Sequence, residues 1–250
     1  MFHFRPLVGL LLLGFSLPLA SQNYDEGFSK PIVTENGKFV YHELRPINTD
    51  LGTFVFLDRN LGATATDASS SDSWGDLYQW GRMTDGHEKR LSRTIPQKAK
   101  TVTSVHHNMF ILDDVQSNNW VENSSGNVWQ ADNPVNNPCP CGYRLPTQAE
   151  WQAVLALGYK VQETNSGYYV LSMADGILEL PAAGLRNAHN GYILHSGTRG
   201  YYWAQDAIRE GTSGSMDFNF EDKLGNISLY GYRAFGRSVR CMRKIVPEKP

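Results

Sequence analysis

The chain has 250 residues and a formal net charge of −2, and charged residues make up only 19% of it. This near-neutral balance argues against a nucleic-acid partner and against binding to an anionic membrane surface. Six tryptophans, twelve tyrosines and 23 glycines indicate a loop-rich domain with an aromatic core rather than a helical bundle.

The first 21 residues predict a secretory signal peptide. Arg5 precedes an apolar run over Leu7–Leu19, and Ala20-Ser21 supplies small residues for cleavage. The run is too short and too weakly flanked to span a bilayer stably, although a buried N-terminal strand or helix is an alternative interpretation. No second long apolar stretch follows. We therefore expect no transmembrane segment after cleavage, and a protein that is secreted, periplasmic or at the cell surface.

Residues 22–46 predict a polar leader followed by a β-hairpin. Ile32–Thr34 and Phe39–Tyr41 flank Asn36-Gly37, a dipeptide that fits a type I′ turn. Thr53–Leu57 is the next expected strand. The chain then continues through a small-residue loop, an aromatic segment and a long irregular region, over residues 63–73, 74–82 and 90–137.

A helix is predicted after Thr147, whose hydroxyl is expected to cap it with Glu150 as capping-box partner. Apolar residues recur at helical spacing from Trp151 to Leu157, and Gly158 ends the pattern. All later signals are β, the expected strands being Tyr168–Leu171, Ile177–Leu180, Gly200–Ala204, Ser215–Phe220 and Arg237–Met242. We therefore expect one domain over residues 47–245 and a tail over 246–250.

Three cysteines in an exported chain leave one thiol unpaired. Cys139 and Cys141 are separated only by Pro140, so a bond between them would be strained. One of the two is therefore expected to pair with Cys241, and Cys139 is favoured. The remaining thiol is either a buried free cysteine, which we prefer, or a catalytic one.

Six ordered motifs resemble a known family. They are Asn60–Ala63, Leu77–Arg82 with Asp85-Gly86, Pro138–Thr147 with Glu150-Trp151, Leu180–Gly184, Gly200–Trp203 and Ser238–Cys241. Together they resemble the Fibrobacter succinogenes major paralogous domain, which is common in exported proteins of Bacteroidetes. The resemblance runs from about Leu51 to Arg243.

The resemblance implies an α+β domain with a C-type-lectin-like fold, related to the formylglycine-generating-enzyme branch, with twisted antiparallel strands, one or two helices and long loops. The family's cysteines fall at Cys139 and Cys241, which supports the pairing favoured above. Cys141 lies where relatives usually carry a small residue, and Ala204-Gln205-Asp206 replaces serines often seen there. The roles of the family are mostly unknown, so the fold does not settle the function.

The sequence offers little evidence for a catalytic site. Gly126–Trp129 is similar to a strand motif of the formylglycine-generating enzymes, but it lies before the helix, and the reactive cysteine pair of that family is not evident. Adjacent histidines in a strand point to opposite faces, so His106 and His107 make a poor metal site. We predict no catalytic residue, with an enzyme using Cys141 or His106/His107 as an alternative.

Metal binding is equally weak in the sequence. His189 and His195, like the histidine pair, are expected at the surface. Oxygen ligands for calcium occur at Asp113-Asp114 and over Asp217–Asp222, but neither has EF-hand spacing. We predict no metal and no cofactor, with calcium left open.

The aromatic and polar composition favours a non-enzymatic binding module whose partner is a glycan or a surface protein. An aromatic ring can lie against the C–H face of a pyranose, and the less constrained aromatics are Trp120, Trp129, Tyr192, Tyr230 and Tyr232. Residues 204–237 have the composition of adaptable binding loops, and an ordinary polar loop with a β-hairpin is the alternative interpretation of this segment. The expected binding residues lie in or beside the late loops that a fold of this kind presents on one face, and they are Arg186, Asn187, Gln205, Asp206, Asp217, Asn219, Tyr230, Tyr232 and Arg233. A structural or adhesive surface component without a discrete pocket is the main alternative.

Overall fold

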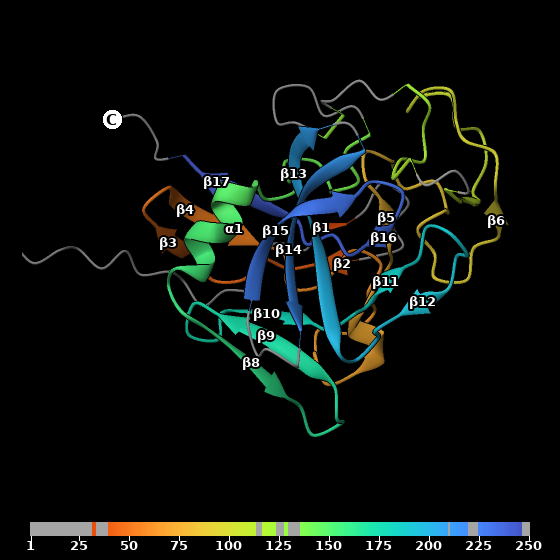
Figure 1. Cartoon of the computed structure of the whole chain (residues 1–250). Coiled ribbons are helices and arrows are strands. Elements are labelled where there is room, and N and C mark those ends of the chain that lie inside the picture. The colour runs from red at the N-terminus through yellow and green to blue at the C-terminus, as the bar shows by residue number, and fades with distance from the viewer. Residues whose placement is uncertain are drawn as a thin grey trace, which may run out of the picture.

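The computed structural model describes residues 32–33, 40–113, 117–123, 128–129, 136–209, 211–219 and 225–246. In this part of the chain the protein is mostly β with a single α-helix, which confirms the expected α+β class (Figure 1). None of the helical segments described here is long and apolar enough to cross a membrane. The expected signal peptide and leader up to residue 31, the turn at Asn36-Gly37 and residues 247–250 of the expected tail lie outside the described residues.

Three antiparallel sheets of three strands each make up the part of the molecule around the helix (Figure 1). Their strand orders are β17–β4–β3, β10–β9–β8 and β13–β14–β15. The bounds are β3 Ile47–Thr49, β4 Gly52–Phe56, β8 Tyr159–Glu163, β9 Tyr169–Met173, β10 Leu178–Pro181, β13 Arg199–Arg209, β14 Thr212–Asn219, β15 Gly225–Tyr232 and β17 Met242–Ile245.

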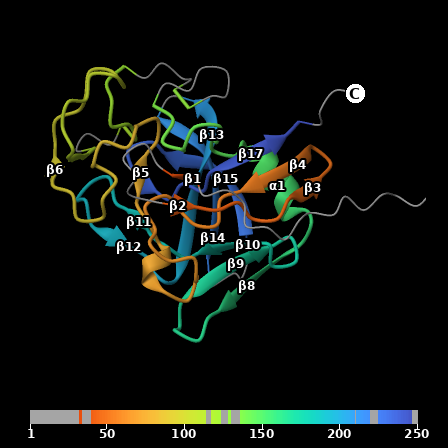
Figure 2. The same ribbon diagram turned by 180° about the vertical axis from the view of Figure 1, so that it is seen from behind.

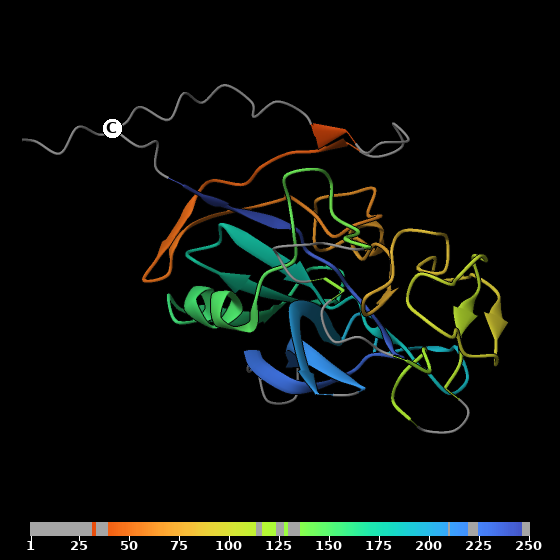
Figure 3. The ribbon, with the colours of Figure 1, turned by 90° about the horizontal axis from the view of Figure 1, so that it is seen from above.

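The remaining strands are short and hold the irregular segments. They form a sheet of order β12–β11–β16–β5, a parallel pair β6–β7 and the expected hairpin pair β1–β2. Figures 2 and 3 show the loop-rich region around β6 on the side of the molecule opposite α1 and the β3–β4 hairpin. The bounds are β1 Ile32–Val33, β2 Val40–Tyr41, a 3₁₀ helix Ser71–Ser73, β5 Tyr78–Gln79, β6 Thr94–Ile95, β7 Phe110–Ile111, β11 Leu185–Arg186, β12 Ile193–Leu194 and β16 Gly236–Arg237.

The helix α1 (Gln148–Leu155) begins with the predicted capping box. Thr147 Oγ1 accepts the Glu150 amide N–H at 3.1 Å, and Glu150 Oε2 accepts the Thr147 amide N–H at 2.8 Å. Arg144 donates to both carboxylate oxygens of Glu150, which fixes the approach of the chain to the helix. The helix ends at Leu155, two residues before the expected Leu157.

The main core lies between the helix and the three sheets. Trp151 and Val154 of α1 are fully buried, and the ring centroids of Trp151 and Phe56 are 5.5 Å apart. Tyr202 of β13 stacks on Phe218 of β14 at 6.3 Å and faces the same cluster. Each element thus turns one apolar face inward, which is the main source of its stability.

A second core surrounds the disulfide. Cys139 and Cys241 are bonded across a sequence separation of 102 residues, which confirms the predicted pairing. Cys241 is completely buried and packs in a cluster with Leu57 and Trp80. Cys141 is exposed, so the preferred expectation of a buried free thiol is wrong.

Tryptophan side chains tie the irregular segments to this core. The Trp80 indole N–H donates to the Ala204 carbonyl at 3.0 Å, and that of Trp203 donates to the Tyr78 carbonyl at 2.7 Å. The Trp120 indole N–H reaches the Trp80 carbonyl at 2.8 Å. Because each bond joins distant parts of the chain, the aromatic residues stabilise a fold with little regular structure.

Two of the late strands differ from expectation. β13 continues to Arg209 rather than ending at Ala204. The expected strand Arg237–Met242 is in fact β16 and β17, which belong to different sheets. Between them the Ser238 amide N–H donates to the Tyr201 carbonyl at 2.9 Å, so the backbone stays paired while it changes sheets.

Candidate functional site

The structure places most of the expected binding residues in strands rather than in late loops. Asp217 and Asn219 lie in β14, where the sequence predicted a strand, whereas the loop expected for Gln205 and Asp206 is wrong because β13 continues through them. Six of the nine expected residues lie in the β13–β14–β15 sheet, namely Gln205, Asp206, Asp217, Asn219, Tyr230 and Tyr232. Arg233 follows β15 directly, and Asn187 follows Arg186, the last residue of β11. The side chain of Tyr230 lies outside the described part of the structure.

Three of the nine are buried in the scaffold, with exposed fractions of 3%, 4% and 2% for Arg186, Gln205 and Arg233. The Arg186 guanidinium lies 4.3 Å from the centroid of the Phe110 ring and donates to the Ser92 carbonyl. Burial lowers the pKa of Arg186 to about 10. The Arg233 guanidinium lies 4.3 Å from the Trp80 ring and donates to the Thr212 carbonyl. Burial keeps these three side chains from a ligand in solvent. Their expected role in ligand binding is therefore wrong, and they stabilise the scaffold instead.

Two expected acidic residues also have partners within the fold. Asp206 Oδ2 accepts the Gln148 amide N–H at 2.6 Å, so this carboxylate stabilises the first turn of α1. Asp217 Oδ1 accepts from Arg237 Nη1 at 2.8 Å, and burial raises the pKa of the Asp217 carboxyl. Asn219 ends β14 and is half-buried. The carboxylates of Asp206 and Asp217 are therefore already engaged by partners within the fold.

Three aromatic side chains form a row that we call the aromatic surface: His189, Tyr232 and Phe235. The ring centroids of Tyr232 and Phe235 are 6.1 Å apart, and those of Phe235 and His189 are 5.8 Å apart with planes at 88°. His189 and Tyr232 are exposed and Phe235 is half-buried. Sequence reasoning found Tyr232, and it expected His189 only as a surface residue.

Hydrogen bonds position the aromatic surface from the β11–β12 hairpin. The His189 amide N–H donates to Asn187 Oδ1 at 2.8 Å, and the Asn187 amide N–H donates to the Tyr192 carbonyl at 2.8 Å. His189 Nδ1 donates to the Asp113 carbonyl at 2.9 Å, which leaves Nε2 as the acceptor of the neutral ring. At the other end of the row the Phe235 amide N–H donates to the Tyr232 carbonyl at 3.0 Å, so hydrogen bonds preorganise the row and lower the ordering cost of binding.

The other aromatics singled out from the sequence divide sharply. Trp120 and Trp129 are buried and belong to the core, so their expected availability to a ligand is wrong. Tyr192 is 70% exposed at the tip of the β11–β12 hairpin. Only burial in the tertiary structure separates these residues, because all stand near polar segments in the sequence.

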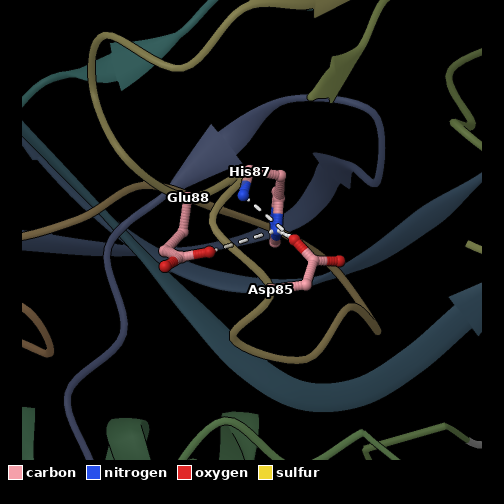
Figure 4. Close-up of side chains that lie close together, drawn as sticks. All are labelled: Asp85, His87 and Glu88. Atoms are coloured by element: carbon pink, nitrogen blue, oxygen red, sulfur yellow. Dashed lines mark hydrogen bonds and ion pairs between the residues drawn. The ribbon is translucent and has the colours of Figure 1, made fainter. Parts of the chain in front are cut away.

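One cluster of three potential metal ligands occurs among the residues that the structure describes: Asp85, His87 and Glu88 (Figure 4). His87 Nε2 accepts the Gln79 amide N–H at 3.0 Å, and Nδ1 contacts Asp85 Oδ1 at 2.8 Å, where it must donate. Glu88 Oε2 accepts the Gly86 amide N–H at 2.7 Å. Both nitrogens of the His87 imidazole already form hydrogen bonds within the protein, so a metal ion could bind only if those bonds broke. The cluster instead stabilises the turn that follows β5.

His87 makes stability depend on pH. Burial lowers the pKa of His87 from 6.5 to about 4. Between these two pH values the His87 imidazole is protonated in the unfolded chain but neutral in the folded chain. The free energy of unfolding should therefore fall as pH drops, by up to about 1.4 kcal/mol per pH unit between these two values. Urea unfolding of wild type and His87→Asn at neutral pH and at about pH 5 tests this, because Asn retains a donor toward Asp85 without titrating. An equal acid-induced loss in both proteins would contradict the assignment.

The residues of the enzyme alternative are not drawn together. His107 Nδ1 accepts the Met109 amide N–H at 3.2 Å, and Cys141 is exposed. In the described part of the chain, neither these two nor His106 belongs to a cluster of three or more His, Cys, Asp or Glu side chains. The enzyme alternative thus gains no geometric support.

The two expected calcium-ligand stretches are only partly described. Asp113 is buried, and its carboxylate accepts from Lys98 Nζ at 2.8 Å and from the Asn118 amide N–H at 2.6 Å. These partners balance its charge without a metal. Asp114 and residues 220–222 lie outside the described residues.

Sequence reasoning missed an open pocket of about 590 Å³, lined by Val40, His42, Arg59, Gly62, Ala63, Thr64, Asp76 and Lys89. It lies where the residues after β2 meet the segment that follows β4. The available signal was the motif Asn60–Ala63, whose glycine adopts a positive φ of 78°. His42 and Lys89, which line the same pocket, are distant from this motif in the sequence, so no local pattern links them to Asn60–Ala63.

Comparison of the chain with protein-family models, with curated proteins and with solved structures found no match.

Proposed function

We propose that this protein is an exported, non-enzymatic binding module that recognises a glycan through the aromatic surface. The observation that carries the proposal is the preorganised row of His189, Phe235 and Tyr232, two of whose rings are exposed. Both exposed rings contact Phe235, and exposed aromatic clusters of this kind commonly mark binding sites.

The chemistry of the row suits a sugar better than a charged partner. The faces of Tyr232 and Phe235 can lie against pyranose C–H groups, while the Tyr232 hydroxyl can bond sugar hydroxyls. His189 Nε2 adds an acceptor beside them. The nearby Asn187 places a further polar side chain on the same hairpin.

Membership of the Fibrobacter succinogenes major paralogous domain family and a C-type-lectin-like fold are part of this proposal. The six ordered motifs and the α+β architecture support both, as does the Cys139–Cys241 bond at the family's cysteine positions. A location at the cell surface or outside the cell rests on the predicted signal peptide and on the disulfide, which persists in oxidising compartments.

Binding of residues 22–250 to a broad glycan array, with and without calcium, tests the proposal. We expect Tyr232→Ala to weaken a specific hit roughly tenfold or more, because truncating an aromatic anchor commonly costs over 1 kcal/mol. Tyr192→Ala is the matched control, since it removes an even more exposed tyrosine that is not part of the row. A specific hit that Tyr232→Ala leaves unchanged would contradict binding through the aromatic surface. A blank array in both conditions would favour the structural or adhesive alternative instead.

A further inference from the structure

The pocket beside β2 shares no residue with the aromatic surface. Its polar lining residues are His42, Arg59 and Thr64, together with Asp76 and Lys89, which form an ion pair. Its volume of about 590 Å³ is within the usual range for small-molecule sites.

The charges in the pocket are already balanced. Lys89 Nζ forms an ion pair with Asp76 Oδ2, and their side chains are 41% and 10% exposed. Arg59 donates to both oxygens of Asp58, through Nε at 3.0 Å and Nη2 at 2.7 Å. An anionic ligand would have to compete with Asp58 or Asp76, and a cationic ligand would have to compete with Lys89, so neither is favoured.

The floor of the pocket is held rigidly. Gly62 has a φ of 78°, and a Cβ at this position would lie 1.9 Å from Asp76 Oδ2. The Gly62 amide N–H donates to the Tyr41 hydroxyl at 3.0 Å, and the Asp76 amide N–H donates to the Leu61 carbonyl at 2.9 Å. Only glycine permits the carboxylate to approach the loop so closely, which fixes Asp76 at the surface of the pocket.

We propose that this pocket binds a neutral, polyhydroxylated ligand, either a single sugar residue or a cyclic polyol. Each hydroxyl both donates and accepts, so it can bond an Asp76 oxygen and the Lys89 ammonium without displacing either from the other. Thr64 and His42 offer further partners of the same kind. The inference does not depend on the aromatic surface, and the two sites can be tested separately.

The test is an NMR titration of ¹⁵N-labelled residues 22–250 with methyl glycosides of glucose, mannose and galactose and with myo-inositol. Sodium acetate and inorganic phosphate are the charged comparators. We expect at least one neutral compound to shift the amide signals of Gly62, Ala63 and Thr64 at millimolar concentration. The glycoside and inositol arms distinguish a sugar from a polyol as the source of the hydroxyls.

Two variants locate the effect in the pocket. Thr64→Val and Lys89→Met should each weaken the response about fivefold, the effect of losing roughly 1 kcal/mol of hydrogen bonding. Lys160→Met, on the exposed face of β8, and Tyr232→Ala should leave it unchanged. Stronger shifts with acetate or phosphate, or no shift at these amides with any neutral compound, would overturn the proposal. Loss of the response in Tyr232→Ala would instead assign the binding to the aromatic surface.

Discussion

Replacing Cys241 by serine should destabilise the domain by about 4–5 kcal/mol, because the bond to Cys139 closes a loop of about a hundred residues. Such a bond lowers the chain entropy of the unfolded state, and the resulting stabilisation of the folded state increases with the length of the closed loop. Cys241 is also completely buried, so a serine hydroxyl there would need a new partner. The expected fall in melting temperature is roughly 10 °C or more, measured by calorimetry under non-reducing conditions.

Two further variants make this result specific to the bond. Cys141→Ser alters an exposed thiol and should change stability little. The double variant Cys139→Ser/Cys241→Ser should lose scarcely more than Cys241→Ser alone, because the bond is already absent. Fully additive losses, or an unchanged melting temperature in Cys241→Ser, would mean that the bond does not stabilise the domain.

Replacing Arg240 by methionine should cost about 3–4 kcal/mol in the free energy of unfolding. The guanidinium is buried, and it donates to Asn60 Oδ1 at 3.0 Å, to the Leu57 carbonyl at 3.2 Å and to the Glu179 carbonyl at 3.0 Å. Burial lowers the pKa of Arg240 to about 10, so it remains charged at neutral pH. Methionine fills much of the volume but leaves three acceptors without their donor, and unpaired buried acceptors are costly.

Arg243→Met is the matched control for this prediction. Arg243 lies three residues further on, is 36% exposed in its side chain, and pairs with Glu43 near the surface. Such a pair contributes about 0–1 kcal/mol, so the variant should unfold at nearly the wild-type urea concentration. Equal losses in the two variants would show that burial of Arg240 is not the cause. The comparison needs only chemical denaturation at one pH.

Local chemistry accounts for the features that could be predicted. The capping box at Thr147 and Glu150 depends on residues three apart, so it was visible in the sequence and is confirmed. The hairpin pairing of β1 and β2 and the bond between Cys139 and Cys241 were likewise anticipated. The strand Arg237–Met242 was not, because its change from one sheet to another depends on partners that no local pattern records.

The candidate site shows the same division. Residue type alone indicated that a tyrosine such as Tyr232 suits sugar binding, but Trp120 and Arg233 look equally suitable in the sequence and are buried. Contact between His189 and Phe235 joins residues 46 positions apart in the numbering, and the pocket joins His42 to Lys89. The sequence by itself determined helix capping and the pairing of the first two strands, and it reduced the disulfide to two candidate partners for Cys241, since these follow from neighbouring residues or from few alternatives. Only the tertiary structure decided which polar and aromatic side chains reach solvent together, because burial depends on packing between distant segments.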